Sequence, residues 1–212
     1  MALFIVVVGL LGALGAAQAP IQPATGTKSA ELGFSYSVPQ NWEVLTLPAE
    51  MEQKKAEASQ NAASEDEKKG LACLEPVLTA RDRNSGSILS VEALPFACFG
   101  HQMTNDDLPG FAAGAPEGLR QTFDLGEPVV AMYALGTHSM WVERAHATLK
   151  DHPEIPFTVE IACGLVKKAA VCWMAVAGSD DALHAFERAT VTLDGEALGA
   201  LVPPTAFEKK PT

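Results

Sequence analysis

The amino-acid sequence predicts an α+β domain in which a central antiparallel β-sheet, built from hairpins, is flanked by helices. Two observations support this prediction. Short stretches alternate apolar with polar residues and end in Gly, Pro or Asn, which is the pattern of strands joined by tight turns. A helix follows the last of these stretches, because Ser179 supplies an N-cap and Asp180 and Asp181 an acidic first turn.

The first nineteen residues read as an export signal. Residues 1–19 carry no charged side chain, and Phe4 to Leu14 form an apolar core that is followed by small residues up to Ala19. An uncleaved anchor is the alternative, but a membrane span needs about 20 apolar residues and this run is shorter. We therefore expect a cleaved signal peptide, a periplasmic or extracellular protein, and no stable membrane span after cleavage.

Composition restricts the partners of the mature protein. About 190 residues remain after cleavage, which is the size of one domain able to bury roughly 70% of its unfolded surface. The net charge of −11 repels nucleic acid and anionic lipid headgroups. We expect a monomer whose partner is an envelope protein or a small ligand, not a nucleic acid.

Four segments follow one another in the mature chain. Residues 20–32 are rich in Pro, Gly and Ala and are expected to be a flexible leader. A single domain is expected over residues 33–195. Within it, residues 49–70 have Met51 as their only large apolar side chain, so they form either an exposed helix or a disordered insertion. Residues 196–212 are expected to be a C-terminal tail, which is frayed beyond Ala200, where it contains three prolines.

The strands are expected in hairpin pairs. Each pair is recognised by two extended stretches around a polar break, at residues 34–47, 73–98, 128–149 and 157–178. A short helix is expected to start near Leu108, after Asn105-Asp106-Asp107. The last helix is expected from Ser179 to Leu193, with Phe186 on its apolar side.

Four cysteines in an exported chain suggest two disulfides, and three connectivities are possible. The midpoint of Cys163 and Cys172 falls between Lys167 and Lys168, at the polar break of the last hairpin. A two-residue turn there makes the two cysteines a non-hydrogen-bonded pair, whose Cα atoms lie roughly 4.5 Å apart. Lys-Lys is an unfavourable turn pair, and a longer loop would change whether the two cysteines form a hydrogen-bonded or a non-hydrogen-bonded pair.

Cys73 and Cys98 repeat this arrangement around a midpoint between Ser85 and Gly86. Pro76 and Pro95 would then face each other, so the strands could part before they reach the cysteines. We expect the disulfides Cys73–Cys98 and Cys163–Cys172. A metal site made from these thiols is disfavoured because no Cys-x-x-Cys spacing is present.

The sequence contains no motif for catalysis, metal binding or a cofactor. The five histidines are scattered, with no pair at the i, i+4 spacing: His101, His138, His146, His152 and His184. Neither a Gly-x-Ser-x-Gly elbow nor a phosphate-binding Gly-rich loop occurs. We therefore predict a protein that is not an enzyme and that needs no cofactor.

The best polar set on a predicted strand is Glu143, Arg144 and His146. Arg144 and His146 share a face because side chains in a strand alternate with period two. These groups could bind an anion, although a solvated sheet face is the simpler interpretation. The alternative function that they allow is a small periplasmic enzyme of the hydrolase type.

The stretch Gly33-Phe34-Ser35-Tyr36-Ser37-Val38-Pro39-Gln40-Asn41-Trp42 resembles the opening of PsbP-like domains, where a short strand ends in Pro-x-x-Trp. The late hairpin followed by a C-terminal helix is similar too. The resemblance implies an α/β/α sandwich over most of residues 33–193, and a non-enzymatic accessory or binding protein. No functional residue is carried over from that superfamily. The most favoured function is thus an exported, disulfide-stapled, non-catalytic binding or accessory domain of the bacterial envelope.

Overall fold

The computed structural model describes residues 27–45, 56, 60, 65–98 and 102–208. The expected signal peptide and the first part of the expected leader lie outside these residues, as does most of the expected insertion at 49–70. In the described part of the chain, no helix is long and apolar enough to cross a bilayer.

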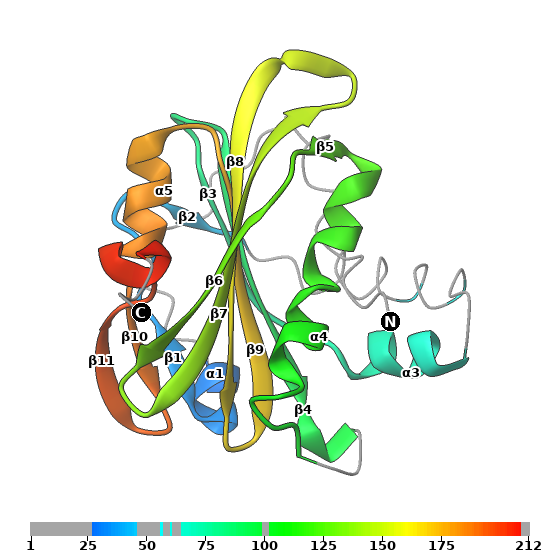
Figure 1. Cartoon of the computed structure of the whole chain (residues 1–212), viewed down its shortest axis with the longest axis vertical. Coiled ribbons are helices and arrows are strands. Elements are labelled where there is room, and N and C mark those ends of the chain that lie inside the picture. Colours follow the sequence, from blue (N-terminus) through cyan, green and yellow to red (C-terminus); the bar gives the residue numbers. More distant parts are fainter. Residues whose placement is uncertain (1–26, 46–55, 57–59, 61–64, 99–101, 209–212) are drawn as a thin grey trace.

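A large antiparallel sheet forms the centre of the molecule (Figure 1). Its strand order is β2-β3-β4-β9-β8-β7-β5, and β6 also pairs with β7. The strands are β2 (Glu43–Val44), β3 (Glu75–Asp82), β4 (Ser87–Pro95), β5 (Phe123–Leu125), β6 (Val129–Leu135), β7 (His138–Leu149), β8 (His152–Val166) and β9 (Ala169–Ala177).

A second, three-stranded sheet packs beside the first and has the order β1-β10-β11. Its strands are β1 (Phe34–Tyr36), β10 (Thr190–Leu193) and β11 (Glu196–Ala200). Helical segments complete the fold: α1 (Thr27–Leu32), α3 (Glu65–Cys73), η2 (Phe96–Cys98), α4 (Leu108–Ala112), η3 (Ala115–Gln121), α5 (Asp180–Glu187) and η4 (Pro204–Phe207).

Two hydrophobic cores hold the three layers together, one on each face of the large sheet. The first core lies between this sheet and the layer that contains α5 and the small sheet, and it includes Trp173 and Phe186. The second core lies under α4 and η3 and includes Leu108 and Leu119. Figure 1 shows these layers on opposite sides of the sheet. The predicted α+β class, with an antiparallel sheet between helical layers, is confirmed.

The β8–β9 hairpin has the register expected from the sequence. Val159 lies opposite Val176, Ile161 opposite Met174, and Cys163 opposite Cys172. Every residue of β9 is buried, because both faces of this strand are covered. The two-residue turn at Lys167-Lys168, between the paired residues Val166 and Ala169, accounts for this register.

The Asp194 carboxylate explains how Lys167-Lys168 can form this turn. Its two oxygens accept the backbone N–H of Lys167 at 3.0 and 3.1 Å. Lys168 Nζ donates to the carbonyl of Glu31 at 2.7 Å. The small sheet and α1 therefore stabilise a turn that the local sequence does not favour.

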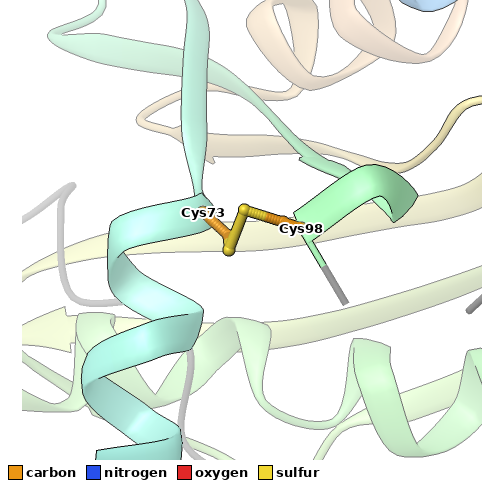
Figure 2. Close-up of a disulfide and its surroundings, with 2 residues drawn as sticks. All are labelled: Cys73 and Cys98. Atoms are coloured by element: carbon orange, nitrogen blue, oxygen red, sulfur yellow. A yellow bond between two sulfur atoms is a disulfide. The ribbon is translucent and has the colours of Figure 1, made fainter. Parts of the chain in front are cut away.

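The two cysteine pairs lie at disulfide distance as expected. The Cα separation is 4.2 Å for Cys163–Cys172 and 5.7 Å for Cys73–Cys98. Figure 2 shows Cys73 at the end of α3 and Cys98 in η2, so the second bond joins the two segments that flank the β3–β4 hairpin.

The β3–β4 register differs from the expected one. Asp82 pairs with Ser87 around a four-residue turn, so the midpoint lies between Asn84 and Ser85, and an irregularity between Pro76 and Leu78 shifts the pairing further along. Pro76 therefore lies opposite Glu92, and Pro95 pairs with Ala169 of β9. The two prolines do not face each other.

The prediction of a hairpin at residues 34–47 is wrong, although the chain does turn at residues 39–42. Trp42 N–H donates to Pro39 at 3.3 Å, but β1 pairs with β10 and β2 pairs with β3. Ser37 N–H continues the pairing with β10 by donating to Thr190. The turn consequently carries the chain from the small sheet to the large one.

The C-terminal region also differs from expectation. The last helix ends at Glu187 and not at Leu193, because Val191 and Leu193 alternate with threonines in β10. Asp194 and Gly195 have φ values of 50° and 87°, as a type I′ hairpin turn requires. The expected tail contains β11 and η4, and Leu201 and Val202, in the part expected to be frayed, are buried.

Part of the expected leader is structured as well. Residues 27–32 form α1, whose last turn is closed by Gly33 N–H donating to Ser29 and Ala30. Gly33 takes a φ of 95°, a value that glycine adopts without steric cost. The ordered fold therefore begins before residue 33.

Reduction of both disulfides is expected to lower the melting temperature without abolishing folding. The chain-entropy model assigns about 3 to 4 kcal/mol to the longer Cys73–Cys98 loop and under about 3 kcal/mol to the Cys163–Cys172 loop. Peptide mapping of the oxidised protein checks the pairing. A peptide that links Cys73 or Cys98 to either late cysteine would contradict both hairpins.

Candidate functional site

The polar set expected on β7 does not come together. Glu143 lies on the face of the sheet that carries the second core, whereas Arg144 and His146 lie on the other face, as period-two alternation requires. Glu143 is buried, and burial raises its pKa. The charge of Arg120 lowers this pKa, and the charge of Glu117 raises it. His146 is exposed. The three groups therefore do not form the catalytic site that the hydrolase alternative requires.

Arg144 is instead the centre of a polar cluster that joins several elements. Its Nε donates to Glu160 of β8 at 2.5 Å, and its Nη2 donates to Glu187 of α5. The guanidinium also lies over the ring of Phe207 in η4, 4.4 Å from the ring centre. Arg144 thus ties α5 and η4 to the large sheet.

Glu160 is the buried member of this cluster. Its side chain is fully buried, and burial raises the pKa of the carboxyl to about 7, although Arg144 acts in the opposite direction. Tyr133 of β6 donates to the carbonyl of Leu201 at 2.5 Å. Burial, with a smaller effect of Glu160, raises the pKa of Tyr133. These contacts hold residues 187–207 against the sheet, which is a structural role.

A second buried carboxyl, Glu92, lies on the opposite face of the sheet. Its neighbours in register are Pro76 on β3 and Cys172 on β9. Among the described residues, neither carboxyl oxygen has a hydrogen-bond partner. Burial raises the pKa of Glu92 to about 7. No local pattern indicates that Glu92 is buried, because a lone Glu in a strand usually points to solvent.

The raised pKa of Glu92 makes stability depend on pH. Between the ordinary pKa of a glutamate and pH 7, the Glu92 carboxyl is protonated in the native state and ionised in the unfolded chain. The stability conferred by the neutral carboxyl is therefore fully present below the ordinary pKa and is lost as pH rises toward 7.

Glu92→Gln is expected to raise the free energy of unfolding at pH 8 by about 2 to 3 kcal/mol, with little effect at pH 4. Denaturant unfolding at both pH values measures this. The exposed Glu127→Gln is the control, and an equal effect of the two variants would contradict the assignment.

The tryptophans and the other histidines of the described chain have ordinary structural positions. Trp42 and Trp173 belong to the first core, and Trp141 packs against the second. His138 Nδ1 lies 3.0 Å from the carbonyl of Leu165, and His184 is exposed on α5. His101 lies outside the described residues. Within the described ranges, no three His, Cys, Asp or Glu side chains gather in a way that could hold a metal ion.

A groove of about 610 Å³ lies between α1 and the outer face of the small sheet. Its floor is formed mostly by residues of β1, β10 and β11 that point away from the first core, although the core residues Tyr36, Val191 and Leu198 also line it. The helix α1 contributes Ser29 and Ala30. Ala197 and Gly199 on β11 have small side chains, which leaves the floor hollow. This site was not expected from the sequence, because its four elements fell in the leader, the first hairpin, the last helix and the tail.

Hydroxyl groups dominate the polar chemistry of the groove. Ser37 Oγ accepts the Thr190 N–H at 2.8 Å and lies 2.8 Å from Thr190 Oγ1, so these two residues fix the pairing of β1 with β10. Ser35 and Thr192 lie opposite each other in the same sheet. Among the described residues, no hydrogen bond holds their side chains. These two hydroxyls are therefore available to a ligand.

The groove has no carboxylate, imidazole, amine or thiol among its lining residues, and its one titratable side chain is Tyr36, whose pKa is raised by burial so that the hydroxyl stays protonated. A serine or threonine hydroxyl needs an adjacent base to act as a nucleophile, and the lining side chains supply none. The arrangement can donate and accept hydrogen bonds and can contact apolar surface. It is therefore suited to binding an uncharged ligand and lacks the groups for acid–base or covalent chemistry.

Comparison with known proteins gives little further information. No protein-family model matches the chain, and no curated protein matches it significantly. Among solved structures, the chain is similar to the solution structure of cyanobacterial PsbP (CyanoP) from Synechocystis sp. PCC 6803, with 13% sequence identity and a TM-score of 0.41. The match covers 82% of this chain and 88% of that chain. PsbP-like domains are also what residues 33–42 resemble.

Proposed function

We propose that this chain is an exported, non-catalytic binding domain of the bacterial cell envelope, and that its binding surface is the groove between α1 and the small sheet. The observation that carries the proposal is the lining of the groove, which combines available hydroxyls with small apolar side chains and has no charged group. An uncharged polar ligand, or an uncharged segment of a partner protein, matches this chemistry. A binding function is supported because the lining has no carboxylate, imidazole, amine or thiol, and burial raises the pKa of Tyr36, its one titratable side chain.

Two features support the exported location. Cysteine pairs at disulfide distance are typical of oxidising compartments. Residues 1–19 have the length and the small-residue end of a cleaved signal. The N-terminal sequence of the protein recovered from the periplasm should begin near residue 18 or 20. Recovery of the full-length chain from the cytoplasm would contradict export.

The groove is tested by filling it. A Cβ added at Gly199 meets no atom within 4 Å, and the backbone there has no positive φ. Gly199→Leu should therefore place a side chain in the groove and leave the melting temperature nearly unchanged. We expect this variant to lose the envelope component that the wild-type domain captures from an envelope extract.

Gly110→Leu provides the matched control, because Gly110 in α4 also has open space around an added Cβ and lies on the opposite layer. This variant should capture the same component as the wild type. Equal capture by the wild type and both variants would place the binding surface outside the groove.

A further inference from the structure

Strand β6 forms an open edge of the large sheet. It pairs with β7 along its whole length, from Val129 opposite Arg144 to Leu135 opposite His138, with no register shift. Within the described residues, no strand pairs with its other edge. Figure 1 shows β6 at the front of the sheet, with no described segment crossing in front of it.

This edge lacks the features that usually protect edge strands. Residues 129–135 contain no charged side chain, no proline and no bulge, and the strand is seven residues long. Three of its large side chains are unusually exposed: Val129 by 61%, Val130 by 42% and Met132 by 51%. Natural sheets blunt such edges with lysines, prolines, bulges or short strands, because an unprotected edge pairs with another chain.

We propose that β6 pairs antiparallel with β6 of a second copy of this chain, around a two-fold axis at Met132. In this register Met132 faces its own counterpart, Val130 faces Ala134, and Ala131 faces Tyr133. Val130 and Tyr133 then lie opposite alanines on the same face of the joined sheet, and Val129 lies opposite Leu135 as an apolar pair. The two large sheets become one continuous antiparallel sheet, and both open edges are removed.

The lack of charge on β6 allows a second copy to be the occupant. Each copy carries a net charge of −11, so two copies repel each other, and the repulsion is weakest where the surfaces that meet carry no charge. The seven residues of β6 form such a surface. In the proposed register the nearest acidic residue on the same segment, Glu127, faces the uncharged Thr137. A two-fold interface must be complementary to itself, and this segment fulfils that requirement.

The proposal differs from the monomer expected from the sequence, and sedimentation equilibrium of the oxidised protein tests it. The wild type should show a concentration-dependent dimer. Met132→Lys should be monomeric over the same range, because the two-fold axis brings the two lysines together. Ile155→Lys is the control, since Ile155 is a 42% exposed apolar residue of β8 outside β6 and receives the same charge. This control should dimerise like the wild type.

A mixing experiment tests the register itself. Met132→Glu alone should also be monomeric, whereas an equimolar mixture of Met132→Lys and Met132→Glu should form a 1:1 dimer, because residue 132 then faces an opposite charge. A wild type that stays monomeric at all concentrations would overturn the proposal. A dimer that persists in Met132→Lys, or a mixture that stays monomeric, would overturn the β6 register.

Discussion

Phe186→Ala is expected to lower the free energy of unfolding by about 3 to 5 kcal/mol. Phe186 is fully buried on α5 and joins the helix to the first core, where its ring lies 6.5 Å from that of Tyr36. The substitution would leave a cavity between α5, the small sheet and the large sheet, which cannot close without moving the whole helix.

Denaturant unfolding of the oxidised protein measures this effect. His184→Ala, an exposed position on the same helix, is the control and should change stability by less than about 0.5 kcal/mol. A loss below about 1 kcal/mol for Phe186→Ala would mean that α5 does not pack on the sheet as described.

Arg144→Met is expected to cost about 3 to 5 kcal/mol at pH 8, because it leaves the buried carboxylate of Glu160 without its cation. The cost should be smaller at pH 5. Burial already raises the pKa of Glu160 to about 7, so at low pH the carboxyl is protonated and needs no partner. The double variant Arg144→Met/Glu160→Gln should recover much of the loss at pH 8.

Arg120→Met is the matched control for Arg144. Arg120 forms a surface ion pair with Glu117 at 3.2 Å, with both side chains nearly half exposed, so its loss should cost less than about 1 kcal/mol. If Arg144→Met costs no more than Arg120→Met at pH 8, the Arg144 cluster does not hold α5 and η4 on the sheet.

Sequence reasoning succeeded where local signals and long-range packing agree. The β8–β9 register follows from the symmetric placement of Cys163 and Cys172 about a polar break, and the face built in that register is apolar. The N-cap of α5 is equally local: Ser179 Oγ accepts the Ala182 N–H at 3.2 Å. Such features need no knowledge of distant segments.

Sequence reasoning failed where pairing is long-range. The first stretch, residues 34–36, pairs with residues 191–193, and nothing near β1 in the sequence indicates this partner. One usable signal was overlooked. Threonines alternate with apolar residues over Thr190-Val191-Thr192-Leu193, and Asp194-Gly195 follows. This pattern is a hairpin signature and could have revealed β10 and β11. The groove depends on that pairing, so it could not be expected without it.

Chemical-shift mapping of the oxidised, isotopically labelled domain tests the groove as the binding surface most directly. The probes are uncharged mono- and disaccharides and capped dipeptides. We expect binding probes to shift the amide signals of Ser35, Thr192 and Gly199, and Gly199→Leu to remove these shifts. Shifts that cluster around Arg144 or Glu143, with the groove unaffected, would contradict the account.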